Sequence, residues 1–161
     1  MIRFKHILVP VDFEQSSRDA LDVAVDLALT FDSKLTLLHS WESVAYAYAT
    51  LPYVSADLSI AIEQAAKDQL STLRARVAER LPRVEVTLTR GPPAFDIVEV
   101  AERLKADLIV MGTHGRRGMS HVLLGSVAEK VVRCSPIPVL TIRGGAPVAS
   151  KVSLRPAHAP A

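Results

Sequence analysis

The chain has 161 residues, enough for one domain with a buried core and too few for two domains of ordinary size. Apolar residues make up 49% of it and the formal net charge is only +2, so neither a nucleic-acid-binding surface nor a membrane-spanning segment is indicated. The single cysteine, Cys134, cannot form an internal disulfide, and no secretory leader is visible, so we predict a cytoplasmic protein in which this thiol is partly buried.

The first forty residues predict a strand, a helix and a second strand. The apolar run His6–Val11 predicts a buried strand. From Ser16 onwards apolar residues recur at helical spacing, with Ser16 or Ser17 as the candidate N-cap. Leu35–His39 is again apolar and predicts the second strand. The two strands should be parallel and joined by a right-handed crossover.

The middle of the chain predicts a loop, a long helix, a strand and another helix. Trp41–Ser55 holds the only tryptophan and all three tyrosines without a regular period, so we predict a loop that covers a ligand or packs on its own domain or a partner. Ala56–Leu81 has the apolar stripe of a long covering helix. Val84–Thr89 alternates as a strand does, and the turn Arg90–Pro93 leads into a helix over Phe95–Leu104.

The last third predicts a strand, a glycine-rich loop, a helix and a final strand. Leu108–Met111 is continuously apolar, which is typical of a parallel sheet buried on both faces. Helical spacing returns over Val127–Cys134, and Pro138–Ile142 predicts the final strand. Residues 144–161 are rich in glycine, proline, alanine and serine, which predicts a flexible tail behind a domain over residues 1–143.

The glycine-rich loop has the spacing of a phosphate site that follows neither common nucleotide motif. Gly112, Gly115, Gly125 and Ser126 give the spacing G-x2-G-x9-G-S, which differs from G-x-G-x-x-G and from the P-loop. Glycines allow backbone N–H groups to approach a phosphate closely, and a helix N-terminus favours negative charge. A tight connection that binds no ligand is the alternative.

Other residues of this loop add hydrogen-bond donors and a helix start. His114, Arg116 and Arg117 supply positive charge and donors, although His114 is nearly as well explained by a bond to the backbone of its own loop. Ser126 and Glu129 form the S-x-x-E pattern of a capping box, which would begin the helix at this point.

Asp12 directly follows the first predicted strand. Open α/β sheets bind ligands at the carboxyl ends of their strands, so this location favours a binding role. The alternative is an aspartate that caps the first helix.

Several longer motifs carry a family resemblance. They are Met-Gly-Thr-His-Gly from Met111, Leu-Leu-Gly-Ser-Val-Ala-Glu up to Glu129, and Ser-Pro-Ile-Pro-Val-Leu up to Leu140. With the glycine spacing, they resemble the ATP-binding branch of the universal stress protein family over roughly residues 3–143. The resemblance implies a single-domain, Rossmann-like α/β fold with an open five-stranded parallel sheet in the order 3-2-1-4-5 and helices on both faces.

The same resemblance implies a nucleotide site and a dimer. Asp12, with Pro10 and Val11, would contact the nucleoside, and Ser40 would contact adenine. The phosphates of ATP, with or without bridging Mg²⁺ or Mn²⁺, would lie against a set from the glycine loop: Met111, Gly112, His114, Gly115, Arg116, Arg117, Gly125, Ser126 and Val127. A homodimer would form through the last strand, Pro138–Ile142.

Efficient catalysis is not predicted. Phosphoryl transfer needs a carboxylate or a water-orienting group near the γ-phosphate, and no carboxylate lies between Asp107 and Glu129. The patterns H-E-x-x-H and G-x-S-x-G are absent, as is a His-x-Gly-His element near the first strand, so no catalytic or metal-ligating set is assigned. We therefore predict an ATP-binding stress or signalling protein with slow or no hydrolysis. A slow ATPase that uses Asp12 and a metal, and a nucleotide-independent interaction protein, remain alternatives.

Overall fold

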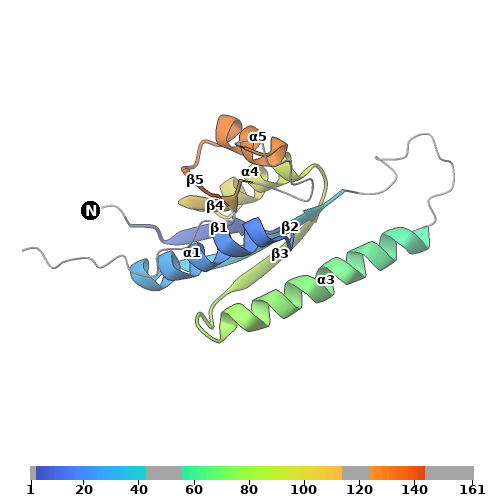
Figure 1. Ribbon diagram of the computed structural model, residues 1–161, viewed down its shortest axis with the longest axis horizontal. Helices are drawn as coiled ribbons and strands as arrows, with labels where there is room; N and C mark the ends of the chain where they lie inside the picture. The colour runs from blue at the N-terminus through green and yellow to red at the C-terminus, as the bar shows by residue number, and fades with distance from the viewer. Residues whose placement is uncertain (1–2, 43–55, 114–123, 144–161) are drawn as a thin grey trace, which may run out of the picture.

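The computed structural model describes residues 3–42, 56–113 and 124–143. In this part of the chain, five parallel strands form one sheet in the order β3-β2-β1-β4-β5, with helices on both faces (Figure 1). The strands are β1 (His6–Pro10), β2 (Lys34–Trp41), β3 (Glu85–Arg90), β4 (Leu108–Gly112) and β5 (Val139–Ile142). The helices are α1 (Gln15–Phe31), α3 (Ala56–Ala78), α4 (Pro93–Arg103) and α5 (Ser126–Cys134). The predicted fold class and strand order are confirmed.

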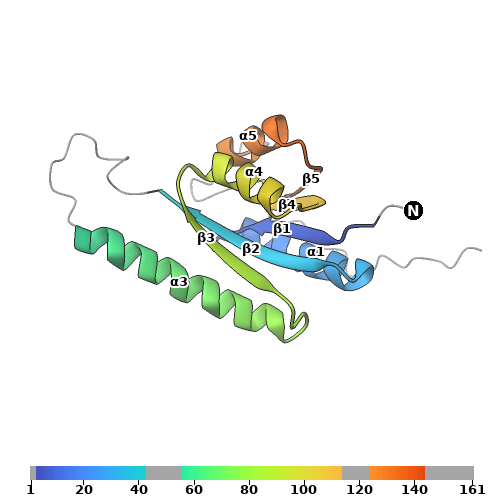
Figure 2. The same cartoon turned by 180° about the vertical axis from the view of Figure 1, so that it is seen from behind.

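The core lies in two layers, one on each face of the sheet. Ile7 and Val9 of β1 pack with α1 and α3, whereas Leu8 points to the other face and packs with α4 and α5. Figure 2 shows α4 and α5 together near β4, with α3 running along β3 at the other end of the sheet. Because the central strands are covered on both faces, they contain continuous apolar runs, such as Ile7–Val9 and Leu108–Met111, instead of a regular alternation.

Some element boundaries differ from the predictions. Trp41 is not in a loop: it is the last residue of β2, pairs with Arg90 of β3 and is only 6% exposed. The guanidinium of Arg90 lies 5.2 Å from the centre of the indole ring, a cation–π contact that favours this strand extension. The long helix ends at Ala78, before Leu81, since the backbone N–H groups of Arg80 and Leu81 both turn back to the carbonyl of Val77.

The predicted cap of the first helix is wrong. Glu14 holds the N-cap position of α1, and both Ser16 and Ser17 are buried inside the helix. The hydroxyl of Ser17 donates a hydrogen bond to the carbonyl of Glu14, at 3.0 Å, instead of accepting one from a free helix N–H. The serines come too late in the chain to cap because the helix already begins at Gln15.

The predicted capping box of the last helix is also wrong. Gly125 is the N-cap of α5, with the extended conformation φ −67° and ψ 156°, and no side chain bonds to the helix end. Ser126 is already the first helical residue, so its hydroxyl lies one position past the capping site. Glu129 instead lies 3.7 Å from Arg133 in an exposed ion pair one turn along. Cys134, predicted to be partly buried, is exposed.

Some predictions concern residues that the structure does not describe. The aromatic segment after Trp41 falls mostly within 43–55, and the tail is 144–161. The middle of the glycine loop, 114–123, contains His114, Gly115, Arg116 and Arg117 and is likewise outside the described residues.

Candidate functional site: the crevice at the carboxyl ends of β1 and β4

The order of the strands reverses between β1 and β4. β1 pairs with β2 on one side and with β4 on the other, where Ile7 lies opposite Leu108 and Leu8 opposite Ile109. The connections from β1 and β4 lead to helices on opposite faces, α1 and α5. In an open α/β sheet such a reversal leaves a crevice beyond the carboxyl ends of the two strands.

Asp12 lies at this crevice and forms a tight turn. One carboxylate oxygen, Oδ1, accepts a hydrogen bond from the backbone N–H of Glu14 at 3.1 Å. The backbone N–H of Asp12 donates to the hydroxyl of Ser17 at 3.3 Å, which ties the turn to the first turn of α1. No described residue bonds to the other oxygen, Oδ2, so it remains available to a ligand. Asp12 therefore does not cap α1, whose N-cap is Glu14; it shapes the turn before the helix and still offers an acceptor.

Gly112, at the end of β4, allows α1 to approach closely. A Cβ atom added to Gly112 would lie 2.7 Å from both the backbone carbon and the carbonyl oxygen of Ser16. These distances are much shorter than van der Waals contact, so the atom would clash with α1. Glycine is thus required at this position for packing. The close approach brings the beginning of α1 against the end of β4, next to the turn of Asp12.

The two ends of the glycine loop meet at the end of β4. The backbone N–H of Gly125 donates to the carbonyl of Thr113 at 2.6 Å, and that of Thr113 donates to the carbonyl of Ile142 at 2.9 Å. α5 therefore begins beside the strand that the loop leaves, and its first residue, Ser126, is exposed. The structure thus brings Gly112, Gly125 and Ser126 together, with the N-terminal N–H groups of α5 at the same edge.

Four of the predicted site residues contribute through their backbone or through packing. Val11 and Met111 are buried in the core, at 5% and 4% exposure, one on each face of the sheet. Pro10 is the last residue of β1, and the partly buried side chain of Val127 packs against the core layer on the α4 and α5 face of the sheet. These four residues pack the ends of the strands beside the crevice. The polar groups of the crevice come from the residues next to them in the sequence.

Ser40 lies at the end of β2 and is held by α4. Its hydroxyl lies 2.6 Å from Oδ2 of Asp96 and 3.0 Å from the carbonyl of Gly91. Asp96 is only 7% exposed and belongs to the first turn of α4, where the helix dipole favours its negative charge. Sequence reasoning missed Asp96, although an acidic residue directly after a Gly-Pro-Pro turn was a usable signal for it.

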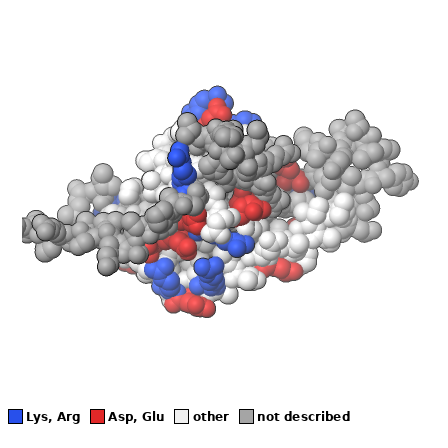
Figure 3. Space-filling view, viewed as in Figure 1, with Lys and Arg blue, Asp and Glu red and all other residues white. Residues whose placement is uncertain are grey.

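Within residues 3–42, 56–113 and 124–143 there is no group of three or more metal-ligating side chains. The helices of these ranges are also too short or too polar to cross a membrane. On the face shown in Figure 3, the charged side chains of the described residues are interspersed by sign instead of forming one basic or acidic patch.

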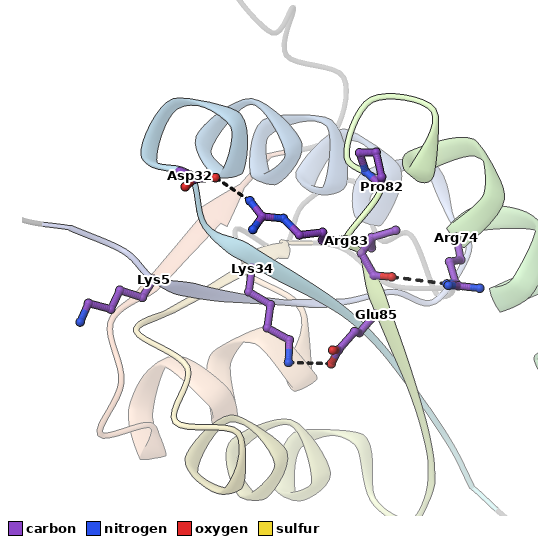
Figure 4. A pocket seen from close by; sticks show the side chains of 8 residues that line it. Lys5, Asp32, Lys34, Arg74, Pro82, Arg83 and Glu85 are labelled. Atoms are coloured by element: carbon purple, nitrogen blue, oxygen red, sulfur yellow. Dashed lines mark hydrogen bonds and ion pairs between the residues drawn. The ribbon is translucent and has the colours of Figure 1, made fainter.

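A second hollow lies at the opposite, amino-terminal edge of the sheet (Figure 4). It has a volume of about 550 Å³, and its lining includes Lys5 and Arg74. Two ion pairs cross it, Lys34 to Glu85 at 2.8 Å and Arg83 to Asp32 at 2.7 Å, and all four side chains are well exposed. Exposed pairs of this kind contribute little energy, and the hollow lacks a buried polar group. It is therefore a weaker candidate than the crevice.

The family model of the universal stress protein family matches residues 3–143. The chain belongs to this family. Universal stress protein MJ0531 of Methanocaldococcus jannaschii is 31% identical over 147 residues, which cover 87% of this chain and 82% of that protein. Universal stress protein UspA from Lactobacillus plantarum has a similar structure, with a TM-score of 0.79, 31% identity, and coverage of 89% of this chain and 100% of that one.

A third relative was solved with a nucleotide. The universal stress protein from Archaeoglobus fulgidus in complex with dAMP has a TM-score of 0.59 and 26% identity, with coverage of 88% of this chain and 98% of that one. The resemblance predicted from the sequence is therefore confirmed at the level of the family and its fold.

Proposed function

We propose that this universal stress protein binds ATP in the crevice between β1 and β4. The observation that carries the proposal is the meeting of Asp12, Gly112 and Gly125 at the one edge where the strand order reverses. In this arrangement the phosphates lie at the start of α5, where backbone N–H groups and the helix dipole favour an anion. The free oxygen of Asp12 accepts from a hydroxyl of the nucleoside. A nucleotide complex of a relative, that of the A. fulgidus protein with dAMP, supports the ligand class.

The proposed site has groups that bind a nucleotide but few side chains that could catalyse its hydrolysis. Among the described residues of the crevice, Asp12 is the carboxylate, and Glu129 is engaged with Arg133 on the surface of α5. Mg²⁺ or Mn²⁺ would therefore be held mainly by the phosphates. We infer a stress or signalling protein that acts through whether ATP is bound, and that hydrolyses ATP slowly or not at all.

The proposal includes an assembly, a compartment and a domain boundary. A homodimer through Pro138–Ile142 would cover β5, which is at the edge of the sheet and has Leu140 at 37% exposure. An exposed free thiol at Cys134 fits a reducing cytoplasm. Residues 1–143 form the domain, and 144–161 are an appended tail.

The test compares the wild-type protein with Gly125→Val. ATP at a hundred times its dissociation constant should stabilise the wild type by about 2.7 kcal/mol, seen as a rise of several degrees in the melting temperature. In Gly125→Val this rise should vanish, because the valine side chain blocks the approach of phosphate to the start of α5. The backbone of Gly125 is in an extended conformation with negative φ, open to any residue, so circular dichroism should show that the variant is folded.

Equal shifts in both proteins, or none in either, would contradict the ATP assignment. Mass analysis of nucleotide released by denaturing the freshly purified protein gives an independent identification of the ligand. A nucleotide-independent interaction protein would release none and would show no shift.

A further inference from the structure

His39 of β2 holds the strand end that precedes Asp12. Its ring nitrogen Nδ1 donates a hydrogen bond to the carbonyl of Val11 at 2.7 Å. The backbone N–H of Val11 donates in turn to the carbonyl of Leu38 at 2.8 Å, so both backbone groups of Val11 are bonded to β2. His39 is 5% exposed, which makes this a buried and therefore costly bond to lose.

The same histidine also contacts the residue that follows Asp12. The rings of Phe13 and His39 are 4.5 Å apart between centroids and tilted by 40°. Phe13 has φ 67°, a left-handed conformation that is unfavourable for a bulky residue. Strained backbone of this kind persists where the surrounding structure holds it, and it is often found at ligand sites. The ring contact is one of the interactions that hold it here.

We propose that His39 is a positioning residue that fixes Asp12 at the crevice in the geometry that a ligand needs. It holds both chain neighbours of Asp12, Val11 through a hydrogen bond and Phe13 through its ring. The turn of Asp12 uses Oδ1 for the N–H of Glu14, and the fixed backbone thus sets where Oδ2 lies. The identity of the ligand as a nucleotide rests on the proposed function.

Such an arrangement affects binding through preorganisation. A carboxylate on a free loop must be ordered when the ligand arrives, and that entropy is subtracted from the affinity. With the loop already held, the acceptor is in place beforehand. His39 itself need not touch the ligand, which distinguishes its role from that of Asp12.

The chain offers a matched control in His6. This histidine lies on the neighbouring strand β1, is 8% exposed, and its Nδ1 also bonds to a backbone carbonyl, that of Leu104, at 3.1 Å. It lies at the amino-terminal end of the sheet, away from the crevice. His39→Leu and His6→Leu should both lower stability, whereas His39→Leu alone should weaken ATP binding, by about 10-fold. His39→Asn keeps an N–H donor near the position of Nδ1 and should recover part of the loss.

A double-mutant cycle tests whether His39 acts through Asp12. His39→Leu should raise the dissociation constant of ATP, measured by calorimetry, by about 10-fold in the wild-type background and less than about 2-fold in an Asp12→Ala background. Equal losses in the two backgrounds would overturn the proposal, because His39 would then act on the ligand by another route. An equal loss of affinity in His6→Leu would overturn it as well.

A measurement without ligand separates this proposal from the ATP assignment. In the absence of nucleotide, backbone amides of residues 12–14 should exchange their hydrogens about 10-fold faster in His39→Leu than in the wild type, and be unchanged in His6→Leu. If wild-type protein binds no ATP but this exchange difference appears, the proposed function fails while the positioning of Asp12 stands. Unchanged exchange in His39→Leu overturns the positioning role whatever the ligand.

Discussion

Gly112 is a residue of the crevice at which the structure leaves no room for a side chain. Its α-carbon faces the first turn of α1, and a methyl group would overlap the backbone of Ser16. Gly112→Ala should therefore lower the free energy of unfolding by about 1–3 kcal/mol, the usual cost of overpacking. Urea unfolding followed by circular dichroism measures this change. An unchanged midpoint would mean that α1 can shift away from β4 without cost.

His6 should make stability depend on pH. Burial is the main cause that lowers the pKa of His6 below its ordinary value of 6.5, and the hydrogen bond to the Leu104 carbonyl opposes it only partly. Above pH 6.5 the ring is neutral in both states and its contribution to stability is complete. As the pH falls below 6.5, the unfolded chain takes up a proton before the native protein does, so stability declines until the lowered native pKa is reached.

The measurement is urea unfolding at pH 7.5 and pH 5.5, compared between the wild type and His6→Asn. The slope due to this one histidine cannot exceed about 1.4 kcal/mol per pH unit. His6→Asn keeps a donor near Nδ1 but cannot titrate, so its stability should fall less over this range. A parallel decline in the two proteins would show that His6 is not the group responsible.

At the scale of single elements, the start of α5 separates stability from binding. Ser126 makes no capping bond, so Ser126→Ala should change the free energy of unfolding by less than about 0.5 kcal/mol. If its exposed hydroxyl donates to a phosphate, ATP affinity should fall about 10-fold in the same variant. Calorimetry and urea unfolding on one preparation give both values. A loss of stability of about 1 kcal/mol would restore the capping role.

The edge strand β5 presents two kinds of backbone group. The carbonyl of Pro138 accepts from Ile109 of β4, and that of Ile142 accepts from Thr113, directly after β4. In a parallel ladder the N–H of Leu140 therefore also points to β4, and those of Val139 and Thr141 point to the open edge. Thr141→Pro should remove an outward donor and convert a dimer into a folded monomer, seen by light scattering. Leu140→Pro should break the ladder to β4 and destabilise the fold. A dimer that persists in Thr141→Pro would reject pairing through this edge.

At the scale of the whole molecule, the sequence predicted the architecture better than the details of the site. Long apolar runs and helical stripes identify the elements because burial on both faces of a parallel sheet leaves a strong pattern. The strand order came from the family resemblance. By contrast, the αL conformation of Phe13 and the bond from His39 to Val11 depend on contacts between separate strands, which no local pattern records.

The errors have the same origin. Both predicted serine caps assume that a polar residue near a helix start must cap it, whereas each helix begins earlier, with Glu14 and Gly125 as the N-cap residues. The prediction of a loop at Trp41 is wrong because its partner, Arg90, is distant in the sequence and only the pairing of β2 with β3 brings the two together. The spacing of apolar residues within one segment predicts whether that segment is a helix or a strand. The residues it contacts can be identified only once the sheet is assembled.

The central position of β1 has a consequence for the newly made chain. The backbone groups on one side of β1 can pair with β2 soon after both are synthesised, whereas those on the other side can pair only after β4 is made. The carboxylate of Asp107, which lies just before β4 and accepts a hydrogen bond from the N–H of Lys5, is 102 residues further along the chain than Lys5. At a synthesis rate of about 5–20 residues per second, the ribosome needs about 5–20 s to add that length. During this interval the first strand of the nascent protein has an open edge in the middle of its future sheet.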